Sequence, residues 1–554
     1  MKDREAENQP HINDPGIVEM SMVPGDTLKD DDDVIKDHVT TVEDDLRPDD
    51  ILQQLGGCGT FQILLAVVIQ SMKLVVAWGM GSNSFFAFVP KWRCADIPIA
   101  QNYTSGYENE TLLCLHDNNA TRDYWNEQCE LPSGEKCQHF EFEKSIHTIV
   151  SEFDLVCDKS WVTATIISLQ MIGMMVGSFI VGHLSDIFGR KIPFISSMAI
   201  LVVFHLVCYF SVNWIMFAVG RFFVGVGSAF FLSIYCIMQG EYMLSKWRST
   251  VISFPSWAIE MCLFTLVAWL LHDWSWMTLL IILGSFLYMA TWFFIPESFR
   301  WLVARDRFKE AQNVVKQLEK CNRRTAPDFD KIVRAFTDDS QPESENYSAL
   351  ILFRNRSLLR ITLPLITGWL SLGLISYGIG FGVKKFSGNF FLNLFLFSIL
   401  SIPSKSITIY LQNVIGRKYT IVLSFCVCFI GGCVVGVIQY IDTPYKGGLG
   451  NGFALAASAG VDAAWGPMQT LTVELYPTVA RTTGFGFLSV LARLGAVIGP
   501  QFVYLEDYVP GLLYFVSAGM AGMSILCVLC LPETMNTTLI DKLTDDQEKQ
   551  RRHE

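Results

Sequence analysis

Long apolar runs alternate with polar segments along the whole chain. A helix crosses a bilayer with about 20 consecutive apolar residues. Long polar segments, at about 90–158 and 296–358, follow the first and the sixth apolar run. The pattern predicts an all-α membrane protein with 12 transmembrane helices, six on either side of a central loop. The twelve runs lie at residues 61–87, 160–182, 192–211, 214–238, 251–271, 275–295, 360–382, 390–411, 419–440, 447–470, 482–503 and 510–531.

The positions of Lys and Arg predict the orientation. If the spans alternate, the segment 296–358 and the basic short loops fall on one side. Because positively charged loops stay in the cytosol, we expect both termini to be cytosolic and segment 90–158 to be extracellular. The basic short loops contain Arg190-Lys191, Lys246 with Arg248, Arg417-Lys418 and Arg481.

The first 50 residues differ from the rest of the chain. They hold 16 Asp or Glu and five Lys or Arg, and such a composition predicts disorder. We interpret this tail as a solvated leader, with a docking or regulatory role as the alternative. The predicted parts are a disordered acidic cytosolic tail (1–55), an N-terminal six-helix half (56–295), a cytosolic central loop (296–358), a C-terminal six-helix half (359–532) and a cytosolic tail (533–554).

The composition agrees with a membrane protein. The chain is 51% hydrophobic and only 17% charged, whereas soluble proteins carry about 25% charged residues. The N-terminus lacks the basic-then-apolar order of a cleavable signal peptide. The sequence contains neither a Walker-type Gly-Lys-Ser/Thr loop nor a His-Glu-x-x-His metal motif, so we expect no enzyme, no ATP-driven pump, no metal and no cofactor.

Segment 90–158 resembles an extracellular loop in its details. It contains three sequons, headed by Asn102, Asn109 and Asn119, which we expect to be glycosylated. Disulfides form outside the cell, and the sequence leaves their pairing open. The candidate cysteines are Cys94, Cys114, Cys129 and Cys137, with Cys157 at the end of the segment.

Three short motifs occur once in each half, in the same order and at nearly one spacing. This is the pattern of two parallel six-helix halves, which place a substrate site between them near the bilayer midplane. The motifs are Gly189-Arg190-Lys191 with Gly416-Arg417-Lys418, Glu241 and Arg248 with Glu474 and Arg481, and Pro296-Glu297-Ser298 with Pro532-Glu533-Thr534.

The loop from Gly182 to Lys191, Gly-His-Leu-Ser-Asp-Ile-Phe-Gly-Arg-Lys, is very similar to the loop signature of the major facilitator superfamily. The resemblance implies the major facilitator fold. Charges at these helix ends can pair across the halves when the cytosolic side is shut and separate when it opens. Simple anchoring by positive charge is the alternative. The residues expected to act in gating are Asp186, Gly189, Arg190, Arg221, Glu241, Arg248, Gly416, Arg417, Glu474 and Arg481.

Finer features resemble solute carrier family 22, the organic cation, anion and carnitine transporters. These are the segment Ser151 to Cys157, the segment Pro296 to Leu302, and Glu474 to Thr478 followed by Arg481. Phe299 stands where the family usually has proline. The resemblance extends from about residue 50 to 540.

Arg493, in the eleventh span, is the residue that we expect to bind a substrate carboxylate. A charge inside a span is a functional candidate, and a guanidinium can hold a carboxylate through two parallel hydrogen bonds. The family resemblance implies Arg here in anion and carnitine carriers and Asp in cation carriers. The stretch from Arg493 to Leu505 looks closest to the carnitine group. The alternative is a structural ion pair with Asp462 or Glu260.

Four further charges lie inside predicted spans: Lys73, Glu260, Lys405 and Asp462. The two carboxylates could face a quaternary ammonium or a coupling cation. They could equally neutralise Lys73, Lys405 or Arg493. Both lysines are expected to face the pore, although either could extend to the membrane surface.

Aromatic rings are a second means of binding a quaternary ammonium. Trp257, Tyr377, Phe381 and Trp465 lie in helices expected to line the site. For each ring alone, packing or contact with lipid is the alternative.

Together these features predict a secondary-active or facilitative transporter of small organic ions that works by alternating access. We expect zwitterionic or carboxylate-bearing substrates such as carnitine-like compounds. The expected partners are the substrate and the lipid bilayer, without nucleic acid; coupling to Na⁺ or H⁺ is open. We expect a glycosylated multi-pass protein of the plasma membrane. The alternatives are an organic cation uniporter driven by membrane potential and a ligand sensor on a transporter scaffold.

Overall fold

The computed structural model describes most of the chain from residue 51 to 535, within the compact unit Leu46–Glu554. It leaves out 52, 55, 97–124, 126, 132, 245–246, 248–254, 340–350, 355 and 443 within that range. Some predictions therefore lie outside the described residues. They concern most of the two tails, the sequons at Asn102, Asn109 and Asn119, Cys114 and Arg248.

The first six apolar runs each form a helix, since only a helix or a closed barrel satisfies the backbone inside lipid. The last of these six helices is extended by the short 3₁₀ helix η2 (Ala290–Phe293). The six are α2 (Thr60–Phe86), α5 (Trp161–Phe188), α6 (Lys191–Tyr209), α7 (Trp214–Tyr242), α9 (Ser256–Leu271) and α10 (Trp274–Met289).

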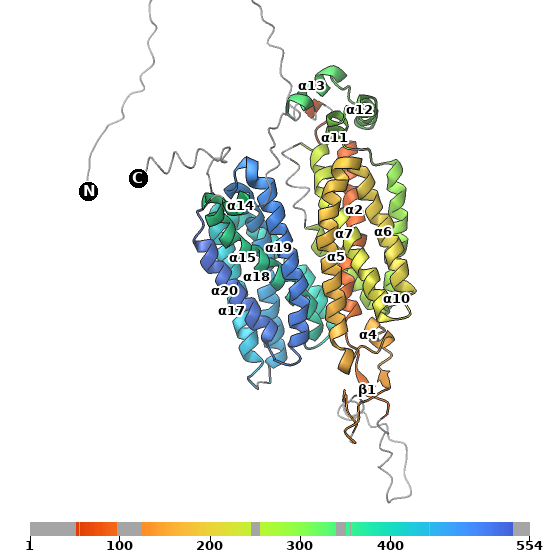
Figure 1. The fold of residues 1–554 in the computed structure, drawn as a ribbon, viewed down its shortest axis with the longest axis vertical. Coiled ribbons are helices and arrows are strands. Elements are labelled where there is room, and N and C mark those ends of the chain that lie inside the picture. Colours follow the sequence, from red (N-terminus) through yellow and green to blue (C-terminus); the bar gives the residue numbers. More distant parts are fainter. Residues whose placement is uncertain are drawn as a thin grey trace, which may run out of the picture. The chain divides into compact units, whose positions relative to one another are not determined.

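The last six runs form the second bundle, coloured from green to blue in Figure 1. Its first helix is followed by the 3₁₀ helix η3 (Val383–Lys385). The six are α15 (Arg356–Gly382), α16 (Phe390–Val414), α17 (Arg417–Ile438), α18 (Lys446–Leu475), α19 (Thr478–Leu505) and α20 (Leu512–Leu529).

All twelve predicted spans thus correspond to a helix of the described chain. Ten of these helices are long and apolar enough to cross a membrane. The other two are α9, an apolar helix of 16 residues, and α18, a helix of 30 residues that includes several glycines. The prediction of an all-α membrane protein is confirmed.

The central polar segment contains helices that pack on the N-terminal half. They are α11 (Phe299–Ala304), α12 (Phe308–Asn322) and α13 (Phe329–Asp339), seen at one end of that bundle in Figure 1. Their apolar side chains, Leu302 and Leu318 among them, join the core of that half. Asn322 accepts a hydrogen bond from the Phe61 backbone at 2.9 Å, which ties α12 to the start of α2. A four-residue helix, α14 (Ile351–Arg354), precedes the second bundle.

The other end of the N-terminal half carries a small disulfide-bonded region. Strands β1 (Trp92–Cys94) and β2 (Phe140–Phe142) pair antiparallel with Arg93 opposite Glu141. Two short helices follow, α4 (Ile149–Glu152) and the 3₁₀ helix η1 (Cys157–Lys159). Cys94 bonds to Cys137, and Cys129 bonds to Cys157. The predicted disulfides are present, with a pairing that the sequence left open.

Helices α15 and α19 approach each other closely at a glycine. A Cβ atom on Gly373 would lie 1.8 Å from the Ala492 carbonyl oxygen of α19. Only a glycine permits this contact, because any side chain would push the two backbones apart.

We therefore expect Gly373→Ala to destabilise the protein by about 1–3 kcal/mol, as other overpacked interiors are destabilised. The matched control is Gly519→Ala in α20, where no atom lies within 4 Å of the added Cβ. Thermal unfolding in detergent should show a lower midpoint for Gly373→Ala and no loss for Gly519→Ala. Equal midpoints for both variants would contradict the described α15–α19 contact.

Candidate functional site

Five charged side chains from separate helices form what we term the central charged cluster. Its members are Lys73 of α2, Glu260 of α9, Lys405 of α16, Asp462 of α18 and Arg493 of α19. Electrostatic neighbours link them: Glu260 attracts Lys73, and Lys405 repels Lys73 and attracts Asp462. Asp462 and Arg493 both act on the Tyr377 hydroxyl. The structure thus brings five predicted charged residues, with the Tyr377 hydroxyl beside them, into one neighbourhood that spans both halves.

Lys73 and Glu260 form the N-terminal part of the cluster. Lys73 is only 6% exposed and Glu260 only 5%. The Lys73 ammonium donates to the Ser256 hydroxyl at 2.7 Å and lies over the ring of Trp257 at 5.9 Å from its centroid. The Glu260 backbone carbonyl accepts a hydrogen bond from the Trp78 indole at 2.9 Å.

The C-terminal part contains the other predicted residues. Asp462 accepts a hydrogen bond from the Ser401 hydroxyl of α16. The Trp465 indole donates to the Ser376 hydroxyl of α15 at 2.8 Å, so that ring is held by packing and hydrogen bonding within its own half. The Tyr377 ring contacts the Phe381 ring, with centroids 6.0 Å apart.

Arg493 differs from the other members of the cluster. It is partly exposed and makes neither an ion pair nor a hydrogen bond with any residue that the structure describes. The structural ion pair with Asp462 or Glu260, the alternative that the sequence left open, is not formed in this structure. Each of those carboxylates instead lies near a lysine.

The predicted gating loops are held by two glutamates that sequence reasoning did not select. The Glu297 carboxylate accepts from the backbone N–H of Arg190 at 2.7 Å, at the start of α6. In the second half, the Glu533 carboxylate accepts from the Arg417 N–H at 2.9 Å, at the start of α17. A carboxylate at a helix N-terminus satisfies free backbone donors and the helix dipole. The sequence feature that could have identified these two glutamates is the recurrence of Pro-Glu together with Gly-Arg-Lys in both halves.

The two glycines of these loops are explained by the same contacts. Gly189 and Gly416 have φ of 92° and 94°, a region that favours glycine. A Cβ atom on either would collide with the carboxylate of Glu297 or Glu533. The repeated Gly-Arg-Lys motif is therefore a binding place for the glutamate that follows the last helix of its half.

The charged gating residues form pairs within each half. Arg417 contacts Glu474 at 3.2 Å, and Arg190 contacts Asp186 at 3.1 Å and Glu241 at 3.9 Å. Arg481 donates to the Tyr476 carbonyl. Each of these three pairs and this hydrogen bond therefore lies within one half.

Arg221 lies deeper than the other predicted gating residues. It is fully buried and donates to the Gly79 carbonyl at 2.7 Å and to the Asn83 amide oxygen at 2.6 Å. It therefore joins α7 to α2 within the N-terminal half and does not contact the loop pairs.

Contacts between the halves concentrate at the end that carries the disulfides. The Ser168 hydroxyl donates to the Val497 carbonyl at 2.7 Å, and the rings of Phe88 and Phe390 lie 4.5 Å apart. Lys384 of η3 donates to the Ala87 carbonyl at the end of α2. The halves are thus joined at the side predicted to be extracellular.

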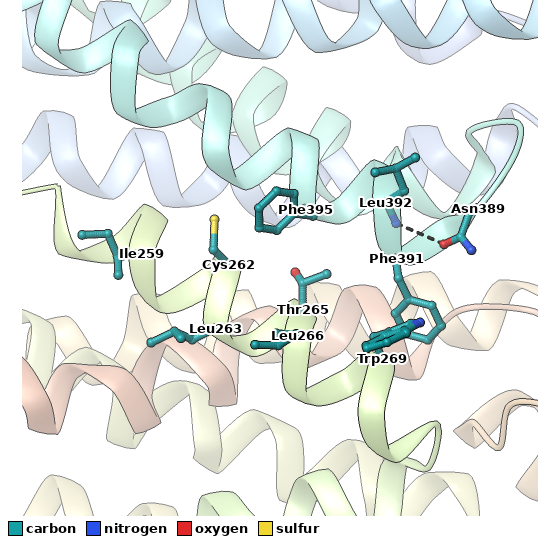
Figure 2. A pocket seen from close by; sticks show the side chains of 10 residues that line it. All are labelled: Ile259, Cys262, Leu263, Thr265, Leu266, Trp269, Asn389, Phe391, Leu392 and Phe395. Carbon is teal, nitrogen blue, oxygen red and sulfur yellow. Dashed lines mark hydrogen bonds between the residues drawn. The ribbon is translucent and has the colours of Figure 1, made fainter.

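A pocket of about 470 Å³ lies between α9 and α16 (Figure 2). Its lining is mostly apolar, with Leu263, Trp269 and Phe395 among the residues that contribute. The Asn389 side chain there accepts from the Leu392 N–H at 3.1 Å. No member of the central charged cluster lines this pocket, so the mostly apolar pocket is distinct from the cluster.

Comparison with known proteins agrees with this architecture. Residues 66–543 match the family described as "Sugar (and other) transporter", so the chain is a transporter of the major facilitator type and belongs to that family. It is 30% identical to solute carrier family 22 member 21 of Mus musculus, over 90% of this chain and 93% of that protein. The chain is accordingly a member of solute carrier family 22, a membrane transporter and not an enzyme.

Other relatives and solved structures are similar over most of the chain. Human organic cation/carnitine transporter 2 is 28% identical, over 89% of this chain and 93% of that protein. The partially occluded inward-open xylose transporter XylE from E. coli has a TM-score of 0.59 at 14% identity, over 86% of this chain and 100% of that chain. Its inward-open form has a TM-score of 0.58, over 86% and 98%. These likenesses show the major facilitator fold.

The hydrogen bonds from backbone N–H groups at the start of α6 to the Glu297 carboxylate predict the effect of removing that charge. Glu297→Gln should destabilise the protein by about 1–2 kcal/mol, because a charged acceptor for backbone N–H groups becomes neutral. The control is Glu310→Gln, which removes only an exposed pair with Arg307 and should change stability by at most about 1 kcal/mol. Thermal unfolding of both variants tests the contact; a Glu297→Gln midpoint equal to that of wild type would contradict it.

Proposed function

We propose that this transporter carries small organic ions that bear a carboxylate, including zwitterions of the carnitine kind, and that Arg493 binds the carboxylate. The observation that carries the proposal is the lack of an acidic partner for Arg493 among the described residues. A guanidinium inside a membrane protein needs compensation by an anion, a hydrogen-bond acceptor or water. A substrate carboxylate would supply it through two parallel hydrogen bonds.

The charge balance of the cluster supports the same class of substrate. It contains three cations, Lys73, Lys405 and Arg493, against two carboxylates, Glu260 and Asp462. Each carboxylate lies in the field of a lysine. The remaining positive charge is that of Arg493, so a ligand with a carboxylate leaves the site closer to neutral than a simple cation does.

The two ends of the molecule support alternating access about this site. At the disulfide-bearing end the halves share hydrogen bonds and aromatic contacts. At the opposite end the described charged residues pair inside their own halves. If the contacts between the halves broke at the disulfide-bearing end and formed at the opposite end, the cluster would open to one side of the membrane and then to the other. A gradient of the substrate is sufficient to drive such a carrier.

The alternative of an organic cation uniporter would depend on Glu260 and Asp462. Glu260 favours it in one respect, because both of its carboxylate oxygens are buried without a hydrogen-bond partner. The neighbouring Lys73 opposes it, since a second cation near Glu260 would be repelled by the lysine. We therefore place the carboxylate-binding function first.

The cellular setting follows from the same proposal. A carrier with a disulfide-bonded outer region suits the plasma membrane, because disulfides persist outside the cytosol. Digestion with an N-glycosidase of protein labelled at the cell surface would test both the location and the sequons in segment 97–124.

The proposal predicts a selective loss of transport in Arg493→Ala. Removing one partner of a buried charge pair costs about 2–5 kcal/mol. Because each 1.4 kcal/mol is about a factor of ten in affinity, uptake of radiolabelled carnitine should fall at least about 30-fold. Uptake of tetraethylammonium, which has no carboxylate, should not fall in parallel. The measurement is initial uptake in cells that express equal amounts of each protein at the surface.

Arg493→Lys serves as the control for this experiment. It keeps the charge and loses the two-pronged geometry, so carnitine uptake should be intermediate between wild type and Arg493→Ala. Wild-type uptake of tetraethylammonium alone, unchanged in both variants, would contradict the proposal and favour the cation uniporter.

A further inference from the structure

The Lys73 ammonium lies in surroundings that are typical of a binding site for a foreign cation. It donates to the Ser256 hydroxyl at 2.7 Å and lies 5.4 Å from the ring centroid of Tyr235 and 5.9 Å from that of Trp257. Ser256 in turn donates to the Gln70 amide oxygen at 3.1 Å. We call the groups of Gln70, Tyr235, Ser256, Trp257 and Glu260 around this ammonium the Lys73 cage.

Glu260 completes the cage electrostatically. Glu260 is only 5% exposed. Both of its carboxylate oxygens are buried and lie outside hydrogen-bond geometry with the described residues. The Ser256 hydroxyl donates to the Gln70 amide oxygen at 3.1 Å and also lies beside the Glu260 carboxylate. The Lys73 ammonium is the larger of the two groups that favour the charged carboxylate, and the Ser256 hydroxyl is the other.

Lys73 cannot leave this position by extending to the membrane surface. It lies near the middle of α2, which runs from Thr60 to Phe86. At 1.5 Å per residue, either end of the helix is about 20 Å away, which is beyond the reach of a lysine side chain. The ammonium must therefore be accommodated within the protein interior.

Two aromatic faces, a carboxylate and neutral oxygen acceptors are the groups by which proteins bind alkylammonium ions. We propose that the Lys73 cage is a cation-binding site that the chain fills with its own lysine, and that Lys73 thereby excludes free organic cations from the N-terminal half. Ligands excluded by this device are small quaternary or primary ammonium ions without a carboxylate. Lys73 is thus a specificity-determining residue.

The effect of the Lys73 cage on transport rests on the proposed function, because it assumes that Arg493 binds the substrate carboxylate. With the cage filled, Glu260 is neutralised and the N-terminal half offers no net negative charge to a substrate. Selection then falls to the C-terminal half, where Arg493 is free to meet a carboxylate. The ammonium group of a zwitterionic substrate then has to lie outside the cage, and Asp462 is the carboxylate of the cluster that is left to attract it.

Emptying the cage tests the inference directly. Lys73→Ala removes the tethered ammonium and leaves space, whereas Lys73→Met removes the charge and keeps the cage filled with a chain of similar length. We expect tetramethylammonium to raise the unfolding temperature of purified Lys73→Ala, with an apparent affinity at least about tenfold tighter than for wild type. Lys73→Met should respond as weakly as wild type. Sodium chloride at equal concentration controls for ionic strength.

The double variant Lys73→Ala/Glu260→Gln identifies the site of binding. The gained response to tetramethylammonium should disappear in it, because the carboxylate that attracts the cation is neutral. If Lys73→Ala does not fold, Lys73→Ser, which keeps a small polar side chain, takes its place in the same comparison.

Two results would overturn the inference: no gain of tetramethylammonium binding in the emptied cage, or an equal gain in Lys73→Met. The assay uses no carboxylate and no transport, so its outcome is independent of Arg493. A gained cation response combined with carnitine uptake that is indifferent to Arg493 would sink the proposed function and leave the cage inference standing.

Discussion

A charge buried inside a bilayer has to be compensated by protein groups, water or a bound ion, and this requirement governs the centre of the molecule. Five charges from five helices meet there. Glu260 lies in the field of Lys73, and Asp462 in the field of Lys405. Arg493 is left without an acidic partner among the described residues. The proposed carboxylate substrate, the unfavourable binding of simple cations and the self-filled Lys73 cage all follow from applying one electrostatic rule to these five positions.

The internal repeat supplies the mechanical frame for that centre. Each half binds a glutamate, Glu297 or Glu533, at the start of its third helix, and each pairs an arginine of that loop with a glutamate of its fourth helix. These contacts tie the loops within each half at the end predicted to face the cytosol. The halves are joined at the other end. A carrier built in this way can separate its halves at one end without breaking the contacts inside either half.

Much of the fold could be predicted from the sequence, because spans depend on the local composition of about 20 residues. All twelve predicted runs contain a helix, and the repeated motifs marked both halves. Contacts between distant residues could not be predicted in the same way. The pairing of Cys94 with Cys137 and the placement of the Lys73 ammonium over Trp257 depend on how helices pack, which single residues do not encode. Lys73 and Trp257 were separate candidates in the sequence, and the structure relates them. The role of Arg493 in carboxylate binding stays a prediction. The observation that motivates it, the lack of an acidic partner among the described residues, required the structure.

The most direct test of the central claim is whether a carboxylate, and not the rest of the ligand, is what the purified transporter binds. Glycine betaine and choline form a matched pair, because both carry a trimethylammonium group and they differ in a carboxylate against a hydroxymethyl group. Ligand-dependent thermal unfolding of the wild-type protein should show stabilisation by betaine and little by choline, since only betaine can bridge to the Arg493 guanidinium. Equal stabilisation by choline and betaine would contradict the account.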